Sequence, residues 1–294
     1  MEVVENSCNP GFVNLGLKLQ KEKLMSYIKK FGFGSKTGID LNGEASGILF
    51  DVNKMGNVEL ATTAFGQGIS VTPIQQVRAV SAIVNGGNLY TPYIVKNFLE
   101  PETNTIIKNN EAKSTGQVIS KETSETVKYA LESVVAKGSG HNAYIENYRV
   151  GGKTGTAQTV ENGIYSSSKY ILSFIGFMPA DDPEIVVYVA VSNPKGVVQY
   201  GGTVAAPIAR NIFLSAIDIL DIKKDPKGIP KEYTWLDQKY VVVPDVLGKT
   251  IDDAKKDLKG FSIEYSGSGD SVVYQSPKSG EYAKEGGTVV LMLN

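Results

Sequence analysis

The feature that most constrains the fold is a glycine-rich strand followed by two apolar strands with short connections. Residues 151–157 read Gly-Gly-Lys-Thr-Gly-Thr-Ala, and apolar runs of strand character follow at 170–178 and 184–192. Connections this short favour hairpins, because a parallel connection needs a crossover of about a dozen residues or more. We therefore expect an antiparallel sheet with strands at 149–159, 170–178 and 184–192. We expect the helix over 204–220 to cover one face of it.

The polar residues on the first of these strands suit the wall of an acyl-transfer site. Lys153 supplies a positive charge for a substrate carboxylate and biases nearby proton transfers. Gly155 has no side chain, so a ligand backbone can lie against the strand, while Thr154 and Thr156 add hydroxyl donors beside their own N–H groups. A glycine-rich turn with a solvated lysine is the alternative interpretation, which Lys-Thr-Gly alone leaves open.

Composition excludes several kinds of site and partner. The formal net charge is -1, and the chain has one cysteine, Cys8, and one histidine, His141. These two residues leave no internal disulfide and no set of thiolate or imidazole ligands for a metal, so we expect no metal and no cofactor. A Ser-His-Asp triad is disfavoured because His141 would have to be its base, so a lysine base is expected instead. The charge argues against nucleic acid, and no stretch approaches the ~18 apolar residues of a membrane span.

The chain is expected to form a large domain and a small one, together an α+β protein. We predict the first domain at residues 1–221, a polar, proline-containing linker at 222–239 and a second unit at 240–294. In the second unit, helical spacing of apolar residues follows Thr250, and alternating strands follow it in turn. A unit this small is near the limit of independent stability.

Local signals fix several helix ends in the first domain. Asn9 is a plausible N-cap with Pro10 at the first helical position. Thr72 and Gln75 form a capping box at the start of another helix, and a helix is expected over 120–137.

In this order and spacing, the motifs of the chain resemble those of class B penicillin-binding proteins that carry one PASTA domain. Ser7-Cys8-Asn9 matches the Ser-x-Asn motif of that family, and Lys153-Thr154-Gly155-Thr156 matches its Lys-Thr-Gly motif. Further family-like stretches are residues 29–34, 66–73, 85–87 and 201–207, and the PASTA-like stretches are 243–248, 275–277 and 280–286. Because it has a single C-terminal PASTA domain, the chain is most similar, among such proteins, to the stage V sporulation protein D group.

The chain departs from the family at the nucleophile. The family places a Ser-x-x-Lys motif before Ser-x-Asn, and here Ser-x-Asn begins at Ser7. Two other Ser-x-x-Lys sequences, at 26–29 and 166–169, are expected to be a helix surface and a polar loop. We therefore expect the chain to be a fragment whose nucleophile lies outside it. The parent protein is expected to be anchored in the membrane through a missing N-terminal segment and to act on its extracytoplasmic face.

The resemblance implies a transpeptidase/β-lactamase-like fold, an antiparallel sheet with a helical lobe whose N-terminal part is missing here. It also implies a peptidoglycan D,D-transpeptidase that binds stem peptides and β-lactams and joins other cell-wall synthesis proteins. Ser7 would relay a proton, and Asn9 would hold the base and the substrate amide. Lys153, Thr154 and Thr156 would bind the terminal carboxylate, and the Thr156 N–H would supply half of the oxyanion hole.

Three alternatives stay open. A β-lactamase or D,D-carboxypeptidase shares the motifs and uses water as the acceptor. A non-catalytic cell-wall protein would recognise muropeptides through the C-terminal unit. For Ser7 and Asn9, helix capping alone is the simpler interpretation.

Overall fold

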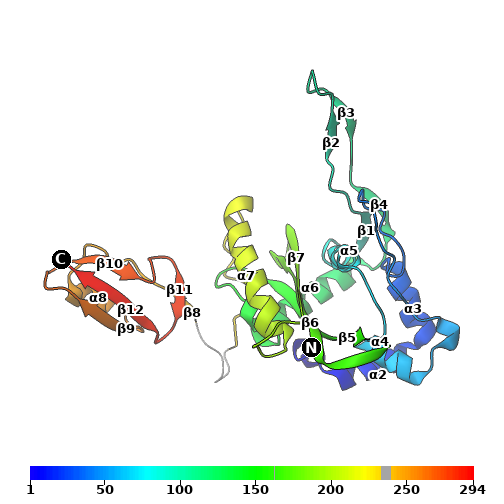
Figure 1. Ribbon diagram of the computed structural model, residues 1–294, viewed down its shortest axis with the longest axis horizontal. Helices are drawn as coiled ribbons and strands as arrows, with labels where there is room; N and C mark the ends of the chain where they lie inside the picture. The colour runs from blue at the N-terminus through cyan, green and yellow to red at the C-terminus, as the bar shows by residue number, and fades with distance from the viewer. Residues whose placement is uncertain (162, 233–239) are drawn as a thin grey trace. The chain divides into compact units, whose positions relative to one another are not determined.

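A computed structural model describes residues 1–161, 163–232 and 240–294, which form two compact units (Figure 1). The first unit is Met1–Lys231 and the second is Glu232–Asn294. Both are mixtures of helix and sheet, as the sequence predicted.

The first unit is built on an antiparallel sheet of β5 (Gly151–Glu161), β6 (Ile164–Met178) and β7 (Ile185–Ser192), in the order β5-β6-β7. The prediction of three sequential antiparallel strands is confirmed. One detail was wrong: the serines at 166–168 were expected in a polar loop, yet they lie in β6. The β5–β6 ladder continues to the pair Glu161 and Ile164, so backbone pairing across the hairpin outweighs the polar sequence there.

Helices cover both faces of this sheet. On one face, α7 (Gly201–Leu220) packs its Phe213 into a core cluster with Phe174 of β6. On the other, Phe177 of β6 lies in a cluster with side chains of α5 (Pro73–Val84) and α6 (Lys121–Lys137). The two rings explain the paired glycines of β5, because a Cβ on Gly151 would lie 2.3 Å from Phe177 and one on Gly152 would lie 2.4 Å from Phe174.

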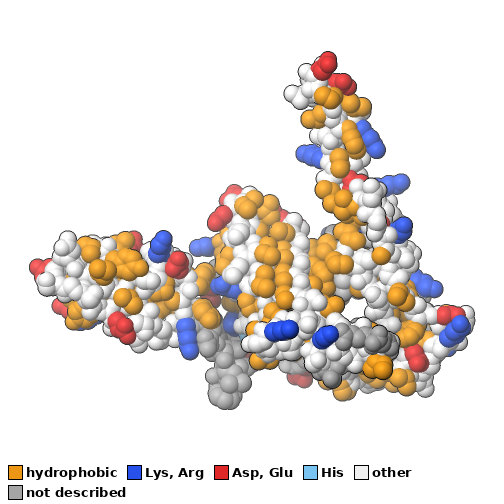
Figure 2. All heavy atoms as spheres, in the orientation of Figure 1, with side chains coloured by type: hydrophobic (Ala, Val, Ile, Leu, Met, Phe, Trp, Pro, Cys, Tyr) orange, Lys and Arg blue, Asp and Glu red, His pale blue; other side chains and the backbone are white. Residues whose placement is uncertain are grey.

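The length and apolar composition of α7 differ from what the sequence predicted. By length and composition alone it is long and apolar enough to cross a membrane, contrary to the expectation that no stretch is. Its inner side, with Ala205, Ala209 and Phe213, is fully buried in the core of the first unit, as in a core helix. Its outer side exposes Ile208, Ile212 and Ile219, and Figure 2 shows hydrophobic side chains along this helix.

The helical lobe contains α1 (Glu2–Glu5), α2 (Asn9–Leu19), α3 (Lys21–Lys30), a 3-10 turn at Val52–Lys54 and α4 (Asn57–Ala64), followed by α5. Thr72 and Gln75 form the expected capping box of α5. The expected N-cap of α2 was wrong: Cys8 is the cap residue, and Asn9 is the first helical residue. The short helices α1 and α4 were not predicted.

A two-stranded arm projects from the first unit (Figure 1). Its base pairs β1 (Asn88–Thr91) with β4 (Lys113–Gln117), and its tip pairs β2 (Asn97–Leu99) with β3 (Ile106–Asn109). The pairing thus makes this arm two successive antiparallel ladders.

The second unit packs a short helix on a small sheet. Its elements are β8 (Tyr240–Val242), α8 (Ile251–Asp257), β9 (Ser262–Ser266), β10 (Val272–Ser276), β11 (Tyr282–Lys284) and β12 (Thr288–Leu293). Strand β12 is central, parallel to β9 and antiparallel to β10. Val243, Val246, Leu258 and Leu291 are fully buried in its core.

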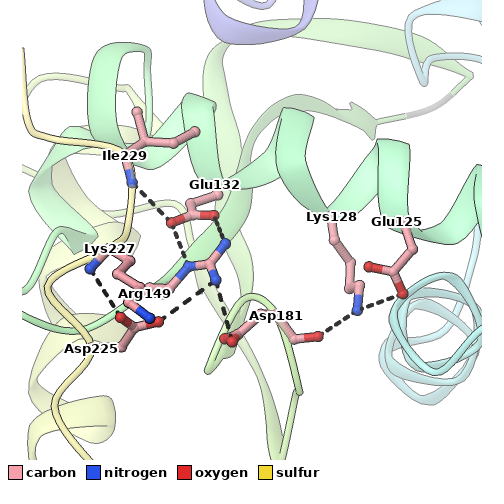
Figure 3. A network of polar contacts seen from close by, with 8 residues as sticks. All are labelled: Glu125, Lys128, Glu132, Arg149, Asp181, Asp225, Lys227 and Ile229. Carbon is pink, nitrogen blue, oxygen red and sulfur yellow. Dashed lines mark hydrogen bonds and ion pairs between the residues drawn. The ribbon is translucent and has the colours of Figure 1, made fainter.

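The segment before the second unit differs from the expected linker. Ile222 is 5% exposed and belongs to the core of the first unit. The N–H of Asp225 donates to Asn147 O at 2.8 Å, and the N–H of Ile229 donates to the Glu132 carboxylate at 3.1 Å (Figure 3). Residues 222–231 therefore pack on the first unit. Their polar composition hid this, because the contacts are made mainly by backbone groups and charges. The rest of the expected linker, at 233–239, lies outside the described residues.

Candidate active site

The site is formed where the loop after α1 meets strand β5. Lys153 Nζ donates a hydrogen bond to Ser7 Oγ at 2.8 Å, although the two residues are 146 positions apart in the chain. The same ammonium donates to the carbonyl of Thr154 at 3.1 Å. Two residues that sequence analysis placed in separate motifs therefore touch.

Backbone geometry directs Ser7 towards the strand. Ser7 has a φ of 53°, in the left-handed region that residues other than glycine seldom adopt. It lies two residues after the end of α1, and the N–H groups of Ser7 and Cys8 donate to the carbonyls of Val4 and Val3 and close the end of that helix. A left-handed residue other than glycine costs about 1–3 kcal/mol and persists only where its surroundings hold it. Such residues concentrate at functional sites.

Lys153 is a partly buried cation with no carboxylate partner among the described residues. Burial removes water from the ammonium and lowers the pKa of Lys153 from 10.5 to about 8. Within residues 1–161, 163–232 and 240–294, its hydrogen bonds go to a hydroxyl and a carbonyl. An incoming anion would supply the missing negative charge, so the site favours a ligand carboxylate.

The neighbouring residues of β5 are held from two sides. Thr154 Oγ1 lies 3.0 Å from Ser139 Oγ, and Thr156 Oγ1 accepts a hydrogen bond from the N–H of Gly201 at 3.2 Å. A Cβ on Gly155 would lie 2.5 Å from Ser173 Oγ, so any larger residue would displace that hydroxyl. Among the described strands β5 pairs only with β6, so its other edge has no strand partner, as addition of an extended ligand to a sheet requires.

The remaining predicted residues are less engaged. Asn9 is exposed at the start of α2, two residues after Ser7, and its side chain has no hydrogen bond among the described residues. Ser26 is exposed on α3, and Ser166 Oγ accepts from the N–H groups of Ser168 and Lys169 within β6. Sequence reasoning missed Ser139, which follows α6 in a glycine-rich turn without a motif of its own. In the described part of the chain, no group of three His, Cys, Asp or Glu side chains is placed to hold a metal ion.

Comparison with protein families identifies this arrangement. The family described as "Penicillin binding protein transpeptidase domain" matches residues 1–214, which include every residue of the site, and the PASTA domain family matches residues 241–294. The chain belongs to the penicillin-binding protein transpeptidase family. It carries one PASTA domain at its C-terminal side.

Two curated proteins of this family are similar in sequence to the chain. The chain is 57% identical over 293 residues to stage V sporulation protein D of Bacillus subtilis (strain 168), covering 100% of this chain and 45% of that protein. It is 31% identical over 247 residues to a peptidoglycan D,D-transpeptidase FtsI homolog of Mesostigma viride, covering 78% of this chain and 40% of the relative. The chain thus spans less than half the length of these two relatives.

Solved structures agree on the fold. Penicillin-binding protein 3 of Mycobacterium tuberculosis, crystallised with ampicillin, matches with a TM-score of 0.71 and 28% identity, over 79% of this chain and 54% of that one. The transpeptidase domain of penicillin-binding protein 3 of Burkholderia pseudomallei matches with a TM-score of 0.67 and 30% identity, over 76% and 64% of the two chains. The transpeptidase fold expected from the motifs is confirmed.

Proposed function

We propose that this chain is the part of a serine D,D-transpeptidase that binds the substrate carboxylate and relays a proton during peptidoglycan cross-linking. The contact of Lys153 Nζ with Ser7 Oγ carries the proposal, since it brings the two family motifs into one site. The attacking serine and its lysine base belong to a Ser-x-x-Lys motif outside these 294 residues. Support for this comes from the exposed position of Ser26 and the strand position of Ser166.

The reaction proceeds in two steps. The serine attacks the carbonyl of the penultimate D-alanine of a stem peptide, an ester forms, and the peptide bond to the terminal D-alanine breaks. The leaving amine takes a proton, which Ser7 relays from the lysine base. An amine of a neighbouring peptide then attacks the ester, forms the cross-link and returns the proton to the serine.

The other predicted residues act on charge and orientation. Lys153, Thr154 and Thr156 bind the terminal carboxylate, while Gly155 lets the peptide lie along the edge of β5 that has no strand partner. The N–H of Thr156 donates to the oxyanion, and Asn9 orients the lysine base and the substrate amide.

The proposal extends to the partners and the location of the protein. The 57% identity to a stage V sporulation protein supports a role in sporulation. The complete protein acts together with other cell-wall synthesis proteins. β-Lactams bind as substrate analogues, supported by the ampicillin complex of the solved relative. The complete protein is membrane-anchored and acts on the extracytoplasmic face.

Labelling with a fluorescent penicillin tests the proposal. The 294-residue chain should form no stable adduct, whereas the longer protein with its Ser-x-x-Lys motif should label. In the longer protein, Ser7→Ala should slow labelling because the proton relay is lost, and Ser26→Ala is the matched control that should not. Labelling of the short chain at one serine located by mass spectrometry would place the nucleophile inside it and overturn the proposal.

Two further measurements separate the alternatives. Rapid release of penicilloate by the longer protein would indicate a β-lactamase. Unchanged binding to purified peptidoglycan after deletion of residues 241–294 would exclude the PASTA domain as the main contact with the wall.

A further inference from the structure

The end of α6 and the turn after it contact the two segments that form the site, α1 with Ser7 and β5 with Lys153. Ser133 lies in the last part of the helix, Gly138 is the C-cap, and Ser139 follows directly. Ser133 is 3% exposed, so its hydroxyl depends on a protein partner. Each of these residues contacts a segment that carries a site residue.

The first wall is α1, which leads into Ser7. Ser133 Oγ donates to the carboxylate of Glu5, the last residue of α1. The N–H of Ser139 donates to the backbone carbonyl of Glu5 at 2.9 Å. A Cβ on Gly138 would lie 2.3 Å from that same carbonyl oxygen, so only glycine permits the approach. Two hydrogen bonds and a close backbone contact therefore fix α1 two residues before Ser7.

The second wall is β5 with the start of α7. Ser139 Oγ lies 3.0 Å from Thr154 Oγ1, next to Lys153. The Ser139 carbonyl would be 2.4 Å from a Cβ on Gly202, and Asn142, just beyond the turn, donates to Gly202 O at 2.8 Å. Ser139 thus contacts both walls. Its N–H donates to the Glu5 carbonyl at the end of α1, and its hydroxyl lies against Thr154 of β5.

We propose that Ser133 and Ser139 are positioning residues that set the distance between Ser7 and Lys153. The inference rests on the proposed function. The two walls come from segments 146 residues apart, and no covalent link holds them in register. Catalysis tolerates little displacement: a shift of about 1 Å can cost about a hundredfold in rate. Because Ser133 and Ser139 hold Glu5 and Thr154, they act on the reaction through Ser7 and Lys153.

Acylation of the complete protein by a fluorescent penicillin tests the role. Ser139→Ala and Ser133→Ala should each lower the acylation rate at saturating penicillin by about tenfold, with a smaller change in the concentration for half-maximal rate. Ser139→Thr retains the hydroxyl and should recover most of the rate. The matched control is Ser124→Ala on the same helix. Ser124 is buried and bonded to Ile83 O and the Gly86 N–H, away from the site, so its loss should lower stability and leave acylation unchanged.

Amide hydrogen exchange on the 294-residue chain gives a readout that needs no reaction. Ser133→Ala should loosen α1 and speed exchange of the Ser139 N–H, while Ser124→Ala should leave that amide unchanged. Unaltered acylation in Ser133→Ala and Ser139→Ala, at melting temperatures that show folded protein, would reduce both serines to a structural role. If exchange changes as expected but Ser7→Ala and Lys153→Ala acylate normally, the positioning geometry holds and the proposed function is wrong.

Discussion

Two cations near the start of the same strand have opposite surroundings. Arg149 lies just before β5 and Lys153 lies within it, four positions later. Arg149 makes a two-pronged contact with Glu132, at 3.0 and 2.8 Å, and pairs with Asp181 at 3.2 Å (Figure 3). Hydrogen bonding to Glu132 raises the pKa of Arg149, against the opposing effect of burial. Lys153 has a hydroxyl and a carbonyl as partners, and burial lowers its pKa to about 8.

The difference separates a structural cation from one available to a ligand. Arg149 also reaches Asp225 at 3.7 Å, so its charge holds α6, the β6–β7 turn and the segment after α7 together. That charge is already neutralised. Lys153 bears the full cost of burial without a counter-charge in the described residues, which is the arrangement expected where a substrate anion completes the site.

The largest expected effect is on stability, from Arg149→Ala. The substitution leaves the Glu132 carboxylate, 4% exposed, without its cation. Breaking such a pair costs about 3 kcal/mol or more, so urea unfolding of the chain should show a loss of that size. Lys195→Ala, at an exposed position, is the control and should change the free energy of unfolding by less than about 0.5 kcal/mol. A loss below about 1 kcal/mol for Arg149→Ala would remove the contrast between the two cations.

Lys153→Ala should lower the acylation rate strongly and the stability little, the reverse of the effect expected for Arg149→Ala. Removing the carboxylate anchor should slow penicillin acylation of the complete protein by about a hundredfold, or ~3 kcal/mol. The free energy of unfolding should fall little, because the substitution also removes a desolvated charge. Acylation rates and urea melts measured on both variants give the comparison directly. Equal losses of stability in Arg149→Ala and Lys153→Ala would show that Lys153 is structural as well.

The smallest expected effect is the contribution of Lys153 to the pH dependence of stability. Between pH of about 8 and 10.5 the unfolded chain keeps a proton on this residue that the folded chain has lost. Stability therefore rises with pH across that window, and Lys153→Met should remove this part of the rise. Acylation of the complete protein should decline above pH of about 8, as Lys153 loses the charge that attracts the carboxylate.

His141→Ala is the control for this pH dependence, since His141 is the one histidine of the chain and lies beside Gly138. Its variant should keep the profile. If the pH profile of stability changes in His141→Ala and not in Lys153→Met, the assignment of the titration to Lys153 is wrong.

Local sequence patterns were sufficient for much of the fold. The three antiparallel strands followed from apolar runs with short connections, and the start of α5 followed from Thr72 and Gln75. These signals act over a few residues, where spacing and hydrogen-bonding side chains decide the backbone. They failed where partners farther along the chain decided the backbone, in the strand position of Ser166 and in the packing of residues 222–231. They also misplaced the cap of α2 by one residue, at Asn9 instead of Cys8.

For the site, the sequence by itself determined which residue types are present, through Ser7, Asn9 and the Lys-Thr-Gly stretch. Only the tertiary structure decided that Ser7 touches Lys153 and that Ser139 lies against both walls. It also decided that Arg149 is neutralised while Lys153 is not, although both are basic residues of one segment. The physical reason is that charge pairing and desolvation depend on which distant elements the fold brings together, and no local pattern encodes those neighbours.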